Sequence, residues 1–230
     1  MHEMFSRNVL FWGEGVQERL QSSSVLVAGV GGLGCAVAHA LVRSGVGRLV
    51  LLDHGTVDPP DLNRQMLYAA DDIGRMKTEV AAERLRALTR LTKVETVPMR
   101  IGGDDVLPAL VADMQVNCVA DCFDNYAARY ALERVVPETC CMVHGGVLRD
   151  FGQVTTIRKD VTSTLQQVLG DQSPATGPLP VAPMIVGVVG NLMAAEVVNV
   201  LCGAPGLLNT LLIVELQDFS LFKIPLWRRD

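Results

Sequence analysis

The sequence predicts an α/β protein whose sheet is largely parallel in the N-terminal half and antiparallel near the C-terminus. Three observations predict this class. Short apolar runs alternate with helical patterns along most of the chain, as in proteins with parallel sheets. The apolar run at residues 25–28 leads into spaced glycines that open a helical pattern. Two further apolar runs, at residues 211–216 and 220–224, lie close enough in sequence to pair as a hairpin.

The N-terminal elements alternate in type. Residues 24–29 predict a strand, residues 32–45 a helix closed by Gly45, and residues 48–53 a second strand that ends at Asp53. These three form a strand–helix–strand unit. The later elements of this half are a helix at 72–90, a strand at 93–99, a short helix through Leu107, a strand at 116–121 and a helix at 126–136.

The C-terminal part opens with two further predicted strands, at residues 140–147 and 153–158. Residues 159–183 are polar and rich in proline, which predicts a long surface loop. The apolar segment at 181–204 is long enough to cross a bilayer, but it carries Asn191, Glu196 and Asn199. We therefore expect a buried helix there, with no membrane partner.

Composition limits the classes of function. The 230 residues are 49% hydrophobic, enough to bury the core of a single domain. The formal charge is -5, and no Lys/Arg cluster is longer than Arg228-Arg229, so the basic footprint of a nucleic-acid-binding protein is absent from the sequence. The start of the sequence lacks the pattern of a signal peptide, which favours a cytoplasmic location.

The six cysteines lie mostly inside apolar runs and are expected to be small buried side chains in a reducing compartment. The sequence contains no C-x-x-C pair, so a zinc site is not expected. His54 and His144 have no identifiable partner in the sequence and are expected to be structural.

The glycines at 29, 31 and 34 fit G-x-G-x-x-G, the pattern of a strand that turns tightly into a helix beneath a phosphate. Asp53 ends the second strand about 20 residues later, where a carboxylate can accept hydrogen bonds from a ribose hydroxyl. Taken alone, this Rossmann-like half favours an NAD-dependent oxidoreductase.

Three later residues point away from that interpretation. Arg64 and Lys77 are cations just beyond the nucleotide-binding unit, and Asp124 follows a later strand of the same sheet. Two cations and a carboxylate suit a triphosphate with Mg²⁺, because the cations bind β- and γ-phosphate oxygens while the acid holds the metal. The alternatives for these residues are solvated surface charges for the cations and a helix cap for Asp124.

Seven segments resemble, in order, the E1-like adenylyltransferases of the MoeB, ThiF and HesA type. They are "FSRN", "VLVAGVGGLGC", "SGVGRLVLLDHGTV", "LNRQ", "DIGRMKTEVAAERL", "DCFDNYAARYAL" and "GQVT". The resemblance implies one ATP-binding adenylation domain over residues 1–230, with a doubly wound sheet and residues 159–183 at the place of the crossover loop. It implies that ATP with Mg²⁺ activates the C-terminal carboxylate of a ubiquitin-like sulfur carrier ending in Gly-Gly, releasing pyrophosphate.

The resemblance also assigns residues to roles. Arg64 and Lys77 would hold the β- and γ-phosphates, Asp124 would bind Mg²⁺, and Arg7 would reach into the ATP site of a partner subunit, which implies a homodimer. The remaining implied nucleotide contacts are Gly29, Gly31, Gly32, Gly34, Asp53, Asp61, Asn63 and Asn125.

The chain also departs from the family pattern. Gly55 stands where the family has a second acid, and Asp61 stands where it has an asparagine. A solvated Asp61 beside a polyanion would cost about 1 kcal/mol of binding free energy. Residues 158–182 contain no cysteine, so thioester or persulfide chemistry is not expected in that loop. These departures leave a second hypothesis, a degenerate relative that binds nucleotide or a partner without turnover.

Overall fold

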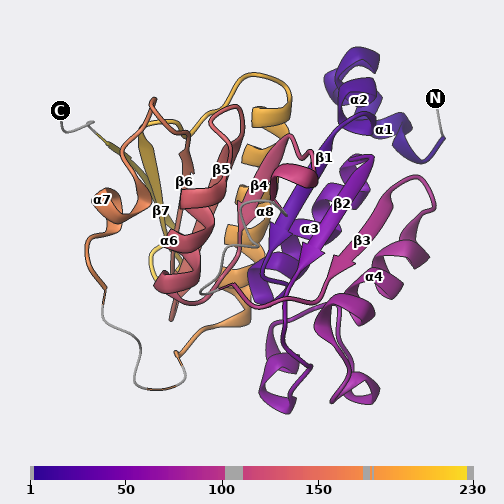
Figure 1. The fold of residues 1–230 in the computed structure, drawn as a ribbon, viewed down its shortest axis with the longest axis horizontal. Helices are drawn as coiled ribbons and strands as arrows, with labels where there is room; N and C mark the ends of the chain where they lie inside the picture. Colours follow the sequence, from indigo (N-terminus) through magenta and orange to yellow (C-terminus); the bar gives the residue numbers. More distant parts are fainter. Residues whose placement is uncertain (1–2, 102–110, 173–176, 178, 227–230) are drawn as a thin grey trace.

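A computed structural model describes residues 3–101, 111–172, 177 and 179–226. Within these residues an eight-stranded sheet runs in the order β3-β2-β1-β4-β5-β6-β7-β8 (Figure 1). The strands are β1 Ser24–Ala28, β2 Arg48–Leu52, β3 Lys93–Val97, β4 Cys118–Asp121, β5 Cys141–Leu148, β6 Phe151–Ile157, β7 Thr210–Glu215 and β8 Ser220–Pro225. The helices are α1 Ser6–Trp12, α2 Glu14–Gln21, α3 Gly32–Ser44, α4 Lys77–Leu88, α6 Tyr126–Val135, α7 Leu165–Leu169 and α8 Pro183–Leu201, with short 3-10 turns η1 Glu3–Phe5, η2 Pro59–Asn63 and η3 Ala70–Asp72.

The strand directions match the predicted class. β3, β2, β1, β4 and β5 are parallel, and β6, β7 and β8 continue the sheet antiparallel. Because β2 and β4 lie on opposite sides of β1, the strand order reverses there. Ligands of open α/β sheets bind at such a reversal, outside the carboxyl ends of the strands.

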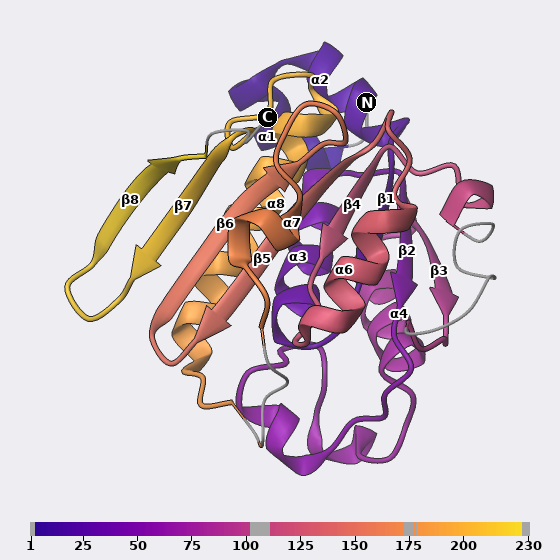
Figure 2. The same cartoon turned by 60° about the vertical axis from the view of Figure 1, so that its left-hand side comes forward.

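Helices cover both faces of the sheet (Figure 2). Val25 and Val27 of β1 pack into the core beneath α3, α4 and α8, whereas Leu26 and Ala28 pack into the core beneath α6 and α7. Strands buried on both faces read as continuous apolar runs, which is why this segment was recognisable in the sequence. The doubly wound α/β fold is confirmed.

Helix α8 is the apolar segment that resembled a membrane span. By length and composition it could cross a bilayer. In this structure it lies against the sheet, and Ile185, Val189, Met193 and Val197 form a buried stripe at four-residue spacing. Glu196 on the same helix is buried and accepts hydrogen bonds from Thr156 Oγ1 at 2.7 Å and the Leu207 amide at 2.8 Å. The predicted helix is therefore present, and it is buried on the face that packs against the sheet, while Asn191 and Asn199 are exposed.

Several predicted boundaries were wrong. The helix expected from residue 72 begins at Lys77, because Gly74 takes a positive φ of 84° and donates its amide to Val57. The expected loop at 159–183 contains α7, which Thr164 caps and Leu165 anchors in the core. Helices α1 and α2 were not predicted. The short helix expected through Leu107 lies outside the described residues.

Candidate active site

The glycine loop joins β1 to α3 and needs glycine for steric reasons. Gly29 has a φ of +89°, and a Cβ there would lie 2.9 Å from the carbonyl of Cys122. Gly31 precedes α3 without a side-chain cap, and a Cβ on it would meet only Gln65 Nε2, at 3.9 Å. The first turn of α3 therefore has backbone N–H groups without a side-chain cap and open space at Gly31, which suits a phosphate. A Cβ on Gly32 would lie 2.8 Å from Val186 Cγ1, so the space does not extend along the helix.

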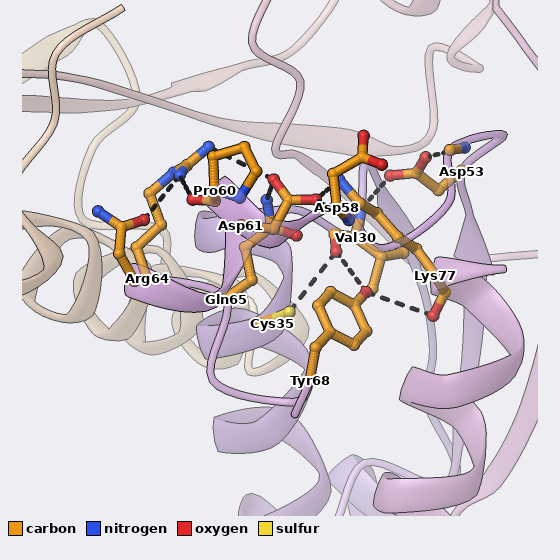
Figure 3. Close-up of polar contacts among 12 residues, drawn as sticks. Val30, Cys35, Asp53, Asp58, Pro60, Asp61, Arg64, Gln65, Tyr68 and Lys77 are labelled. Atoms are coloured by element: carbon orange, nitrogen blue, oxygen red, sulfur yellow. Dashed lines mark hydrogen bonds and ion pairs between the residues drawn. The ribbon is translucent and has the colours of Figure 1, made fainter. Parts of the chain in front are cut away.

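Asp53 follows β2 and connects it to the glycine loop. Its Oδ2 accepts the amide of Val30 at 2.7 Å, and its Oδ1 accepts the amide of Gly55 at 2.8 Å (Figure 3). Each carboxylate oxygen has a second lone pair, so Asp53 can still accept a hydrogen bond from a ribose hydroxyl. A Cβ on Gly55 would lie 3.7 Å from Lys77 Cδ, so residue 55 borders the same cluster.

Asp61 lies between the two predicted phosphate cations (Figure 3). Its Oδ2 is 2.9 Å from Lys77 Nζ, and its Oδ1 is 3.7 Å from the Arg64 guanidinium. The residue is only 7% exposed, and it also accepts hydrogen bonds from Gln65 Nε2 at 2.6 Å and the Asp58 amide at 3.1 Å. Asp61 is thus an ion-paired carboxylate, not the solvated charge considered from the sequence.

Backbone contacts place each cation. Lys77 is the first residue of α4, and its amide donates to Gly55 at 2.9 Å. Arg64 donates to the carbonyl of Pro60 at 2.9 Å and to Asn63 Oδ1 at 2.8 Å. Both side chains are partly buried within the cluster, so the alternative of freely solvated surface charges does not describe them.

Two residues of the cluster were not singled out from the sequence. Tyr68 OH lies 2.6 Å from the carbonyl of Val30 and 3.3 Å from the carbonyl of Lys77, which links the glycine loop to α4. Gln65 is buried, and its Oε1 accepts no hydrogen bond within the described residues. Gln65 stood in the "LNRQ" segment, which was a usable signal. Tyr68 was recognisable only once the fold brought it to the loop.

The loop that carries Asp124 follows β4 and packs against the glycine loop. The amide of Cys122 donates to Ala28 of β1 at 2.8 Å, and the Cys122 carbonyl lies against Gly29. Asp124 itself is exposed. The alternative that it caps the next helix is wrong, because Asn125 is the N-cap of α6 and accepts the Ala128 amide at 2.9 Å.

Arg7 lies apart from the other predicted site residues. It is exposed in the first turn of α1, and its neighbour Asn8 donates to the carbonyl of Arg43 at 3.1 Å, near the end of α3. The glycine loop lies at the other end of α3, about 20 Å away for a helix of this length. In Figure 1, α1 accordingly lies at the opposite end of the sheet from η2 and η3, the purple turns at the bottom of the view. Arg7 therefore does not join the cluster of its own chain.

The cysteines near the site behave as buried thiols. Burial raises the pKa of Cys35 to about 12, and burial raises the pKa of Cys122 well above its usual range. A thiol nucleophile needs a lowered pKa, so neither is suited to covalent chemistry. His144 does have partners, contrary to the sequence expectation, because it contacts Asp121 and Arg129 inside the protein.

The chain is similar to known proteins over most of its length. The model of the ThiF family matches residues 5–229. A sulfur carrier protein adenylyltransferase of Thermus thermophilus is 34% identical over 92% of this chain and 82% of its own length. The SAMP-activating enzyme E1 of Haloferax volcanii is 33% identical over 97% of this chain and 84% of its own, and the molybdopterin-synthase adenylyltransferase of Escherichia coli is 34% identical over 81% and 76%.

Solved structures show the same fold. A crystal structure of E. coli MccB with MccA-N7isoASN superimposes with a TM-score of 0.84 at 21% identity, covering 99% of this chain and 72% of that one. PaaA superimposes with a TM-score of 0.81 at 22% identity, covering 98% and 82%. The names of the sequence relatives confirm the prediction of an adenylyltransferase. The chain belongs to the ThiF family, within its MoeB-like and ThiF-like adenylyltransferases.

Proposed function

We propose that this protein uses ATP and Mg²⁺ to adenylate the C-terminal carboxylate of a ubiquitin-like sulfur-carrier protein. A carboxylate oxygen of the carrier would bond to the α-phosphorus, the bond from that phosphorus to the β-phosphate would break, and pyrophosphate would leave. The carrier is the partner implied by relatives named for sulfur carrier and molybdopterin-synthase activation.

One observation carries the proposal: Arg64 and Lys77 converge beside an uncapped helix N-terminus at the reversal of strand order. Hydride transfer requires no charge stabilisation at a phosphate, whereas a departing pyrophosphate gains negative charge that two such cations stabilise. Their side chains would bind and orient the β- and γ-phosphates. The amides of the glycine loop would meet the remaining phosphate oxygens.

The residues present fit Mg²⁺ as well as ATP. Asp124 is an exposed carboxylate on a loop that packs against the glycine loop, and hard cations prefer oxygen ligands. When bound, the metal would neutralise charge on the phosphates. Asp124 would hold it, and Asp53 would orient the ribose.

Arg7 supports a shared site in a homodimer. Because it lies at the far end of α3, it can serve a nucleotide site only on another copy of the chain. A two-fold dimer would place each Arg7 in the partner's site. A cytoplasmic location and the absence of bound zinc belong to the same proposal.

The direct test is exchange of labelled pyrophosphate into ATP in the presence of a carrier protein ending in Gly-Gly. Lys77→Ala and Asp124→Ala should each lower the exchange rate by roughly a hundredfold or more, which is the scale of losing one charge-stabilising contact in the transition state. Lys93→Ala and Asp71→Ala remove the same charges from exposed positions and should leave the rate unchanged.

Two results would contradict the proposal. Tight NAD binding without measurable ATP affinity would return the protein to the oxidoreductase hypothesis. ATP binding by calorimetry with no exchange, for any carrier encoded beside the gene, would favour the degenerate relative that binds without turnover.

A further inference from the structure

A buried polar network lies directly beneath the loop that carries Asp124. It joins Asp121 at the end of β4, His144 on β5 and Arg129 on α6, which are 0%, 0% and 7% exposed. Asp121 and His144 are paired in register across the parallel strands. Figure 2 shows α6 lying over β4 and β5. The function described so far uses none of these three side chains.

The contact with Asp121 indicates that Nδ1 of His144 carries a proton. Its Nδ1 lies 2.8 Å from Asp121 Oδ2, and its Nε2 lies 3.1 Å from Arg129 Nη1 and 3.3 Å from Gln153 Nε2. Arg129 Nη1 is also 2.9 Å from Nδ1. A carboxylate only accepts, so the ring donates from Nδ1 to Asp121, and Nε2 is left to accept from Gln153 Nε2. Burial and the Arg129 charge lower the pKa of His144, which favours this neutral form.

The network reaches the backbone beside Asp124. The Phe123 amide donates to Asp121 Oδ1 at 3.2 Å, and Arg129 Nη2 donates to the Phe123 carbonyl. Asp121 thus accepts the Phe123 amide, and Arg129 donates to the Phe123 carbonyl, so both backbone polar groups of Phe123 have buried partners. On the other side of Asp124, Asn125 is fixed as the cap of α6. Asp124 therefore lies between two residues, Phe123 and Asn125, whose positions are fixed by hydrogen bonds.

We propose that His144 is a positioning residue for Asp124, acting by donating its Nδ1 proton to Asp121. Without the imidazole, Asp121 loses its donor on β5, so the carboxylate that accepts the Phe123 amide is free to shift. The role of Asp124 as a metal ligand rests on the proposed function. The constraint on residues 122–124 does not.

Two amide variants separate the parts of this network. In His144→Asn the side-chain amide takes the place of Nδ1 and can still donate to Asp121. In His144→Gln the amide reaches the place of Nε2 and the contact with Asp121 is lost. A matched control is Thr155→Val. Thr155 lies opposite His144 on β6, and the substitution removes the 2.9 Å hydrogen bond that its Oγ1 donates to the Thr210 carbonyl.

The first measurement is amide hydrogen exchange of the free protein. His144→Gln should raise the exchange rate of the Phe123 amide about tenfold, because local opening no longer breaks an intact network. His144→Asn and Thr155→Val should leave that rate near wild type. This measurement needs neither nucleotide nor activity, so it tests the positioning role even if the proposed function fails.

The second measurement is the Mg²⁺ concentration at half-saturation of ATP binding, followed by calorimetry. It should rise about fivefold in His144→Gln but stay near the wild-type value in His144→Asn and Thr155→Val. Adding Asp124→Ala to His144→Gln should cause no loss beyond that of Asp124→Ala alone, since both changes act on one group.

The proposal is overturned if His144→Gln lowers the melting temperature as Thr155→Val does while Phe123 exchange and the Mg²⁺ requirement stay at wild-type values. His144 would then only satisfy a buried carboxylate. Increased Phe123 exchange without a change in the Mg²⁺ requirement would instead locate the failure in the metal role of Asp124.

Discussion

Asp61 contacts both cations of the site, so its charge affects how they meet a nucleotide. The carboxylate holds Lys77 at 2.9 Å and lies 3.7 Å from Arg64. This pairing keeps two like charges together in the absence of phosphate. The same negative charge would repel the phosphates of ATP. Asp61 thus has two opposite effects on nucleotide binding: it positions Lys77, and it repels the phosphates.

Repulsion should win in Asp61→Asn. The asparagine keeps an oxygen that accepts from Lys77, while the removed charge repels a nearby phosphate by about 1 kcal/mol at the dielectric constant of water, which is the lower limit for a mostly buried carboxylate and corresponds to roughly a fivefold change in affinity. The KM for ATP in pyrophosphate exchange should therefore fall about fivefold. Asp58→Asn, a change of the same charge at an exposed position in the same turn, is the control. An increase in KM toward that of Lys77→Ala would mean that positioning of the lysine outweighs repulsion.

The pairing of Asp61 with Lys77 could not be predicted from the sequence. The motif placed both residues near a triphosphate, but they are joined through irregular chain between η2 and α4, where no periodicity tells which side chains meet. Asp53 and the glycines were predictable because a strand end and a tight strand-to-helix turn fix their place. The network around His144 escaped prediction for another reason: its members come from β4, α6, β5 and β6, and only the strand register unites them.

At the scale of elements, the predictions held wherever burial imposed a pattern. The strands β1, β2 and β4 are buried on both faces, so hydrophobicity predicted them. The hairpin of β7 and β8 was predictable because two apolar runs are adjacent in sequence, although β8 is largely exposed. The misplaced start of α4 and the missed α7 depend on a positive φ at Gly74 and a cap at Thr164. Such local backbone features leave weaker signals than a buried face.

At the start of α6, the residue that caps the helix lies next to the proposed metal ligand. Asn125 accepts the Ala128 amide, and Asp124 beside it is exposed. Asn125→Ala should therefore lower the free energy of unfolding by about 1 kcal/mol, the usual effect of losing an N-cap, and Asn125→Asp should restore it. Asp124→Ala should leave stability within about 0.5 kcal/mol of wild type. Urea unfolding of the four proteins measures this, and equal destabilisation by Asn125→Ala and Asp124→Ala would contradict the assignment of the cap.

At the scale of the whole molecule, the proposed site needs a second copy of the chain to supply Arg7. Arg7 and the glycine loop lie at opposite ends of α3, and α1 is tied to the far end through Asn8 and Phe5, which packs against Gly45. Moving Arg7 to its own site would require α1 to leave these contacts. A two-fold dimer needs no such movement, since each chain keeps its fold and lends Arg7 across the interface.

Mixed dimers test this arrangement. Arg7→Ala and Asp124→Ala should each be inactive alone. In a mixed dimer the Arg7→Ala chain keeps Asp124 and receives Arg7 from its partner, so one site of the two regains every group. With equal amounts and free exchange, about half of the dimers are mixed, and activity should recover to about a quarter of wild type. Pyrophosphate exchange measures the recovery, and native mass spectrometry of tagged chains confirms that mixed dimers formed. Confirmed mixed dimers without recovery would mean that Arg7 does not act across the interface, because the only site with an intact Asp124 would still lack its arginine.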